Sequence, residues 1–312
     1  MTTRSRSDTH NEDEEECFFC PELFMNRTLV PITYNVQGLD QTVWASNASS
    51  TDHDQTGEII WPISVFLAWF VASQGECFRG HHVIELGAGC AGLPGLIASR
   101  FAAGALLTDG NESVLKTLRR NVAETIELEK GQEKRIESST SIGRSSNSST
   151  TPKGTTSNSN NSESSKRLEA SSLVWGDKES VQAVLDDGWR PQILLGADIV
   201  CWIDFVIPLL QTVKCLFLQA AQPLDAVLYL GFVNRANATE RLLYSQANEM
   251  GMRIVRVPAE TFLPSDKEDW PAELRTTQKL ELLIIKLDPT LDGFDRPVRM
   301  DYSDMVGRAT PC

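Results

Sequence analysis

The sequence has few of the features that mark secreted, membrane-spanning or nucleic-acid-binding proteins. Its seven cysteines are scattered and do not form the even framework of small disulfide-rich domains, so we expect a reducing compartment, the cytoplasm or also the nucleus. The most apolar run, residues 59–72, is shorter than the roughly twenty residues that cross a bilayer, so no membrane partner is expected. Lys and Arg number 29 against 42 Asp and Glu, and this net charge of −13 argues against a nucleic-acid partner.

Metal-binding and signal-like patterns are lacking as well. Cys17 and Cys20 form one C-x-x-C pair, but no second Cys or His pair follows at zinc spacing, so no metal site is predicted. Residues 1–16 do not have the basic-then-apolar pattern of a secretory signal. Because residues 1–22 are polar and acidic over most of their length, we expect them to form a disordered arm.

The rest of the chain predicts one α/β domain, expected as a monomer, over residues 23–288, followed by a tail over residues 289–312. A Ser-, Thr- and Asn-rich segment interrupts the domain over residues 130–168 and is too polar to offset its ordering entropy. An N-terminal hairpin is expected before residue 46, and the run 59–72 reads as a buried helix. Further apolar patterns predict helices at 111–129, 177–187, 205–218 and 239–250 and strands at 191–200, 224–232, 252–257 and 280–287.

The most informative stretch is Val83–Leu96, where an apolar run passes through three glycines into a helix start. Gly87, Gly89 and Gly92 have the G-x-G-x-x-G spacing of a loop that lets backbone approach a ligand closely. Pro94 suits the first turn of the following helix because its missing N–H costs nothing there. This spacing alone fits a dinucleotide-binding loop, another ligand loop or an ordinary strand-to-helix turn.

Two acids narrow the choice of ligand. Glu85 lies just inside the strand end, where a carboxylate suits a ligand with an ammonium group and no phosphate. A second apolar run, Ala105–Asp109, ends in an acid about twenty residues after the loop, where dinucleotide-type sheets bind a ribose diol. The glycines and the two acids together describe S-adenosylmethionine better than NAD.

The motif VIELGAGCAGLPGL followed by LLTD resembles motif I and the second strand of the seven-strand, or class I, S-adenosylmethionine-dependent methyltransferases. More narrowly, residues 57–288 are similar to the methyltransferase-like protein-lysine methyltransferases called family 16. The resemblance implies a Rossmann-like seven-stranded methyltransferase sheet of order 3-2-1-4-5-7-6, flanked by helices, with a small N-terminal β-hairpin as a cap. It also implies a third strand at Ser172–Gly176, S-adenosyl-L-methionine as the cofactor and a lysine of a protein as the acceptor.

Site residues carry over from the family motifs position by position. Asp198, at the end of the strand 191–200, would orient the acceptor amine. The family follows this acid with an aromatic residue three positions on, but this chain has Cys201 there and Trp202 one position later. Trp202 is therefore the candidate for the missing aromatic. Cofactor contacts are expected from Trp61, Glu85, Gly87, Ala88, Gly89, Asp109, Trp175 and Ala197.

Three alternatives remain at the level of sequence. A methyltransferase of the same fold could act on a small molecule or on another side chain. A non-catalytic S-adenosylmethionine-binding module would bind the cofactor without labelling any acceptor. A dinucleotide-dependent oxidoreductase would share the glycine loop, but Glu85 and the lack of a second catalytic motif argue against it.

Overall fold

A computed structural model describes residues 28–46, 57–142, 166–277, 279–298 and 300, and every structural statement below concerns these residues. The predicted arm over residues 1–22, with Cys17 and Cys20, lies outside them. So do most of the predicted interruption and the end of the predicted tail.

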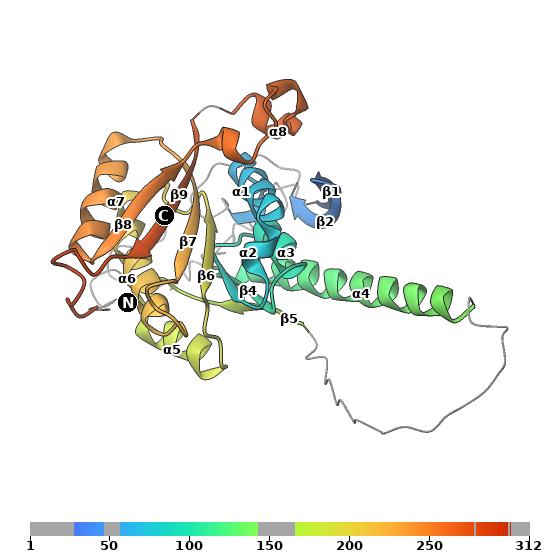
Figure 1. Ribbon diagram of the computed structural model, residues 1–312, viewed down its shortest axis with the longest axis horizontal. Helices are drawn as coiled ribbons and strands as arrows, with labels where there is room; N and C mark the ends of the chain where they lie inside the picture. Colours follow the sequence, from blue (N-terminus) through green and yellow to red (C-terminus); the bar gives the residue numbers. More distant parts are fainter. Residues whose placement is uncertain (1–27, 47–56, 143–165, 278, 299, 301–312) are drawn as a thin grey trace, which may run out of the picture.

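A mixed seven-stranded sheet forms the centre of the molecule (Figure 1). Its order is β5-β4-β3-β6-β7-β9-β8, which is 3-2-1-4-5-7-6 when the seven strands are numbered along the chain. The first five strands in that order are parallel, and β9 runs antiparallel to β7 and β8. The predicted fold class is confirmed. The strands of the sheet are β3 (His82–Leu86), β4 (Gly104–Asp109), β5 (Arg167–Ser172), β6 (Ile193–Ala197), β7 (Val227–Val233), β8 (Met252–Val257) and β9 (Leu280–Leu287).

Helices cover both faces of the sheet, so the central strands are mostly apolar. One hydrophobic core joins α1, α3 and α4 to one face, and a second joins α5, α6 and α7 to the other (Figure 1). The helices are α1 (Pro62–Ser73), α2 (Gly75–Phe78), α3 (Leu93–Ser99), α4 (Glu112–Ile142), α5 (Lys178–Asp186), α6 (Val206–Leu218), α7 (Asn237–Glu249) and α8 (Ala272–Arg275). Short 3-10 turns are η3 (Ile203–Phe205), η4 (Ala259–Thr261) and η5 (Lys267–Asp269).

The expected N-terminal hairpin consists of β1 (Leu29–Val36) and β2 (Leu39–Ser46), paired antiparallel. Its two turn residues, Gln37 and Gly38, have φ angles of 51° and 85°, as tight hairpin turns require. Val36, Val43 and Ala45 are buried in the same core as α1, α3 and α4. The hairpin therefore covers one end of that core, as predicted for a cap.

The apolar run 59–72 forms α1, a helix buried on most sides. Trp61 precedes its first turn and Pro62 occupies it, which matches the preference of proline for the start of a helix. Within the described ranges, no helix has both the length and the apolar character needed to span a membrane.

Two predicted boundaries are wrong. The third strand is β5, Arg167–Ser172, and the predicted Ser172–Gly176 is mostly the loop that follows it. Pairing with β4 decides this, because Gly104 lies opposite Arg167 and Asp109 opposite Ser172. The helix expected to end at residue 129 continues as α4 to Ile142, so the predicted interruption of 130–168 begins too early and ends after β5 has started.

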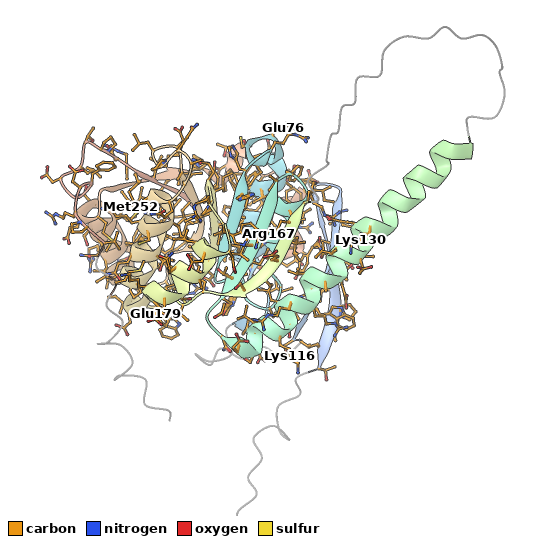
Figure 2. The ribbon with its side chains drawn as sticks, turned by 90° about the horizontal axis from the view of Figure 1, so that it is seen from below. Glu76, Lys116, Lys130, Arg167, Glu179 and Met252 are labelled. Carbon is orange, nitrogen blue, oxygen red and sulfur yellow. The ribbon has the colours of Figure 1, made fainter. Side chains whose placement is uncertain are left out.

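The physical reason for the second error is helix propensity. Residues 127–137 are rich in Glu, Lys, Gln and Arg, which have high helix propensity, so a helix that has begun can continue through them. In Figure 2, α4 extends from the body of the protein past Lys116 and Lys130.

Candidate active site

The glycine loop lies at the carboxyl edge of the parallel strands, between β3 and α3. Gly87, Gly89 and Gly92 have φ angles of 61°, 61° and 56°, which glycine adopts without steric cost. A Cβ atom on Gly87 would lie 2.7 Å from the side chain of Ile199 and 2.9 Å from that of Trp175. The loop therefore needs glycine both for its backbone conformation and for the close approach of its neighbours.

Backbone hydrogen bonds hold the loop in place on both sides. The Ala88 N–H donates to the carbonyl of Thr108 on β4 over 2.8 Å. The Cys90 N–H donates to the carbonyl of Gly57 over 2.7 Å. The segment before α1 and the adjacent strand together fix the loop from opposite sides.

Asp109 is the last residue of β4 and also contacts the loop. Its Oδ2 accepts a hydrogen bond from the Gly89 N–H, and its Oδ1 accepts one from the Asn111 N–H, each over 3.0 Å. Burial raises the pKa of this carboxyl. The Gly110 N–H is a third backbone donor to this carboxylate, and since a carboxylate has about four acceptor positions, it can still accept from a ligand hydroxyl.

Glu85 lies deeper than its place near the strand end suggests. Its side chain is buried, and Oε2 accepts a hydrogen bond from the Gly95 N–H in the first turn of α3 over 2.8 Å. Burial raises the pKa of this carboxyl to about 8. The contact in the structure joins β3 to α3 and thereby positions the loop between them.

Trp175 lies against the loop, whereas Trp61 precedes α1. Trp175, in the segment after β5, meets the ring of Phe205 edge-on at 6.1 Å, and its buried Nε1 has no hydrogen-bond partner among the described residues. Trp61 is half-buried at the start of α1. A glycine cradle, an unpaired buried indole N–H and a carboxylate with spare lone pairs form a set that fits the nucleoside part of S-adenosylmethionine.

Asp198 directly follows Ala197, the end of β6, and it is one of the three non-glycine residues with positive φ among the described residues, at 60°. Its backbone N–H donates to the Gly231 carbonyl on β7 over 3.1 Å. Its carboxylate accepts two hydrogen bonds from the guanidinium of Arg235, one of them, from Nη2 to Oδ2, over 2.7 Å. Arg235, which follows β7, is thereby paired with Asp198.

Cys201 and Trp202 occupy the turn between β6 and α6. The Cys201 thiol is partly buried, and this burial raises its pKa. Trp202 immediately precedes η3 and is 43% exposed. Trp202 is thus exposed, whereas Trp175 lies against the glycine loop.

Strand pairing explains why most predicted residues come together. Leu86 of β3 lies opposite Thr108 of β4 and Gly196 of β6, so the residues after all three strands share one edge. The loop, Asp109, Trp175, Ala197 and Asp198 lie along this edge. Glu85 supports it from below.

Asn121 is a site-supporting residue that the sequence reasoning missed. Its Nδ2 donates to the Cys90 carbonyl of the glycine loop over 2.7 Å and to the Trp44 carbonyl over 3.0 Å, while its Oδ1 accepts from the Trp44 N–H over 2.7 Å. Its side chain is 1% exposed. The sequence feature that could have identified Asn121 is its position three residues after Leu118, on the apolar face of α4.

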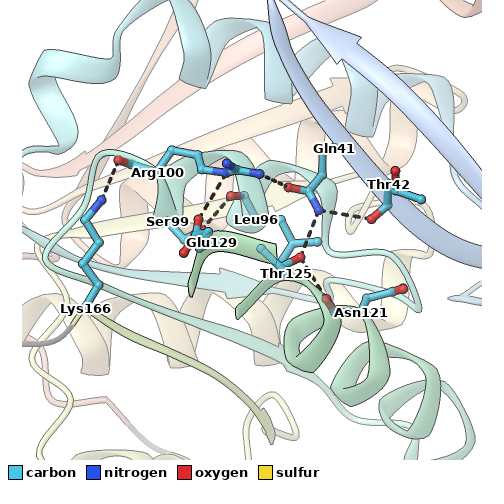
Figure 3. Close-up of polar contacts among 9 residues, drawn as sticks. All are labelled: Gln41, Thr42, Leu96, Ser99, Arg100, Asn121, Thr125, Glu129 and Lys166. Atoms are coloured by element: carbon cyan, nitrogen blue, oxygen red, sulfur yellow. Dashed lines mark hydrogen bonds and ion pairs between the residues drawn. The ribbon is translucent and has the colours of Figure 1, made fainter. Parts of the chain in front are cut away.

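A polar network next to Asn121 joins the hairpin to α3 and α4 (Figure 3). Gln41 on β2 donates to the Thr125 hydroxyl over 3.0 Å and accepts from Arg100 over 3.1 Å. Arg100 also pairs with Glu129 over 3.3 Å. These contacts fix the hairpin against the helices that carry the loop.

Among the described residues, no group of three or more His, Cys, Asp or Glu side chains is arranged to hold a metal ion. Cys17 and Cys20 lie outside the described residues.

Residues 41–139 match the model of a family described as lysine methyltransferase. The chain is 44% identical over 72 residues to a calmodulin-lysine N-methyltransferase of Arabidopsis thaliana, covering 22% of this chain and 23% of that protein. It is 35% identical over 75 residues to the histone-arginine methyltransferase METTL23 of Rattus norvegicus, covering 24% of this chain and 33% of that protein. The matches thus span a third or less of these relatives. The predicted resemblance to this family is confirmed over residues 57–139.

Solved structures with a similar fold include an O-methyltransferase from Bacillus cereus in complex with S-adenosylhomocysteine. It is 12% identical, with a TM-score of 0.39, covering 74% of this chain and 83% of that one. A precorrin-6y C5,15-methyltransferase from Geobacter metallireducens is 10% identical, also with a TM-score of 0.39, covering 70% of this chain and 87% of that one. The fold assignment rests on the strand order described above.

Proposed function

We propose that this chain, which resembles the lysine methyltransferase family through residues 41–139, is an S-adenosylmethionine-dependent methyltransferase that modifies a lysine of a protein. The observation that best supports this is the position of Asp198. It follows β6, which pairs with β3, so its carboxylate lies on the same sheet edge as the glycine loop. An acceptor held by Asp198 would therefore be next to a cofactor held by the loop.

The cofactor would lie over Gly87, Ala88 and Gly89, with its ribose on Asp109 and its adenine beside Trp175. Trp61 and Ala197 would bound its methionine end. Glu85, which is buried under α3, would act through the loop that it positions. S-adenosylmethionine supplies an electrophilic methyl group on a sulfonium centre.

The protein's task in such a transfer is to position the acceptor and to exclude water. The Asp198 carboxylate would hold the incoming ammonium in line with the cofactor. The ammonium must lose a proton before its nitrogen can attack, and this proton would leave to water, since a carboxylate is a weak base. Trp202 would cover the acceptor stem in place of the family's aromatic, because Cys201 offers no ring.

A protein arginine is the second candidate acceptor. One observation favours it, namely that Asp198 binds a guanidinium in the structure through both of its oxygens. One relative, METTL23, is itself named a histone-arginine methyltransferase. The two oxygens of a carboxylate bind a planar guanidinium in a fixed geometry, whereas an ammonium binds to them as a point charge.

We also place the protein in a reducing compartment, the cytoplasm or nucleus. The support is that Cys77, Cys90, Cys201 and Cys215 are all free thiols. An acidic protein would attract a basic protein substrate by long-range charge.

The experiment is transfer of radiolabelled methyl from S-adenosylmethionine into the proteins of a lysate. Wild type is compared with Asp198→Ala and with the control Asp288→Ala, because Asp288 pairs with Arg253 at the opposite edge of the sheet. We expect a labelled protein with wild type and the control, and at least a hundredfold less label with Asp198→Ala. Mass spectrometry of the labelled band then distinguishes lysine from arginine.

Failure has two informative forms. Cofactor binding in calorimetry without any labelled protein would contradict the protein-methyltransferase proposal and favour a small-molecule acceptor or a non-catalytic module. No binding of S-adenosylmethionine at all would contradict the cofactor assignment itself.

A further inference from the structure

Arg235 occupies the position that the proposed function gives to the acceptor. It lies between β7 and α7, and its guanidinium reaches the carboxylate that follows β6. The Asp198 side chain is only 7% exposed, whereas that of Arg235 is 40% exposed. The carboxylate is thus the fixed, buried partner, and the guanidinium reaches it from the solvent side.

An aromatic face completes the binding position. The guanidinium carbon of Arg235 lies 5.5 Å from the ring centre of Trp61, within the range of a cation–π contact. A buried carboxylate on one side and an indole ring on the other is a general way to bind a cationic group. Nothing in this arrangement requires that the cation belong to the same chain.

The backbone of Asp198 has an unusual conformation that a hydrogen bond to the neighbouring strand maintains. Asp198 has a left-handed φ of 60°, a strained conformation that few non-glycine residues adopt. Its backbone N–H bond to Gly231 keeps this conformation in register with β7. Such strain concentrates at functional sites.

We infer that Arg235 is the gate of the acceptor site: it neutralises Asp198 in the free protein, and an acceptor must bring its own side-chain cation to displace it. This inference rests on the proposed function. Arg235 and an acceptor cation cannot both bind the two oxygens of the Asp198 carboxylate, because neither cation would then have both oxygens as partners. A buried carboxylate also cannot stay unpaired, so the exchange must be one cation for another.

The surroundings allow this exchange. The Asn234 amide donates to Glu240, and Glu240 also pairs with Arg256, so the loop backbone is anchored beside Arg235. The half-exposed arginine side chain can therefore swing into solvent while its backbone stays in place. As an internal competitor, it lowers the apparent affinity for every acceptor and excludes neutral or anionic ones.

The test titrates two small cations, methylguanidinium and methylammonium, into Arg235→Ala, wild type and the control Arg253→Ala, with binding measured by calorimetry. Arg253 also pairs with an aspartate, Asp288, but at the other edge of the sheet. We expect one or both cations to bind Arg235→Ala at least tenfold more tightly than wild type or the control. The double variant Arg235→Ala, Asp198→Asn should lose this gain.

Equal binding by wild type and Arg235→Ala would overturn the inference, as would a gain that survives Asp198→Asn. If Arg235→Ala does not fold by circular dichroism, Arg235→Gln removes the charge but keeps most of the side chain, and the same comparison applies. The assay needs neither cofactor nor turnover. A failed gate and a failed methyltransferase assignment therefore give different results, the latter being read from S-adenosylmethionine binding and label transfer.

Discussion

Replacing Glu85 by glutamine should remove a pH-dependent loss of stability that burial imposes on this protein. The carboxyl is 2% exposed, and burial raises its pKa from 4.5 to about 8. Because the folded-state pKa lies above the unfolded one, the stability from this group is fully present below pH 4.5 and is lost as the pH rises towards 8. Glutamine keeps an oxygen that accepts from the Gly95 N–H and does not ionise.

The size of the effect follows from the two pKa values. The whole shift corresponds to about 5 kcal/mol of stability, an order-of-magnitude figure for a group as buried as this one. Between pH 6.0 and 7.5, both inside the interval, wild type should lose about 2 kcal/mol through Glu85 alone. Other titrating groups, including Asp109, are common to both proteins and cancel in the comparison to first order.

Urea denaturation at pH 6.0 and 7.5 measures the free energy of unfolding of wild type and Glu85→Gln. The control is Glu76→Gln, a glutamate exposed on the surface beside Arg79 and labelled in Figure 2. Wild type and the control should lose about 2 kcal/mol more than Glu85→Gln over this interval. Equal pH dependence in all three proteins would refute the claim that the Glu85 carboxyl is buried and largely uncharged near neutral pH.

Three further predictions concern the support of the site. Lys214→Met should lower the free energy of unfolding, measured in urea, by about 3 kcal/mol, because the buried Lys214 ammonium donates to the carbonyls of residues 293, 294 and 296. An unchanged free energy would contradict the role of Lys214 in holding this segment. Asn121→Ala should weaken S-adenosylmethionine binding, measured by calorimetry, by about tenfold, because the Cys90 carbonyl in the loop loses the hydrogen bond from the Asn121 amide. An unaltered affinity would show that Asn121 does not support the site. Gly87→Ala should abolish S-adenosylmethionine binding, because its Cβ would meet Ile199 and Trp175. The control Gly38→Ala, also at positive φ but with open space around it, should lower only the stability of the protein. Cofactor binding by Gly87→Ala would refute the role of the glycine loop.

The site could be predicted from the sequence where its residues are close along the chain or follow strand ends. Gly87 and Gly89 lie in a loop between a strand and a helix, as their spacing indicated, and both have left-handed φ angles. Asp109 ends its strand, as predicted, and it also contacts the loop. In each case the local pattern is enough, because parallel neighbouring strands bring their carboxyl ends to one edge.

Contacts between distant segments could not be predicted in this way. Asn121 binds Cys90 and Trp44, and nothing local to α4 indicates either partner. The pair of Arg235 with Asp198 likewise depends on β6 and β7 being neighbours and on the direction of one loop. The start of β5 was set by pairing with β4, whereas the family resemblance had placed this strand at residues 172–176.

The sequence by itself determined the α/β class, the glycine loop and the acids at the strand ends, because periodicity and glycine spacing act through local backbone sterics. Tertiary structure alone decided the charges of this site. It buried Glu85 under α3 and raised its pKa, and it neutralised Asp198 with Arg235. Burial and pairing are set by what folds over a residue, and only the folded chain brings those partners together.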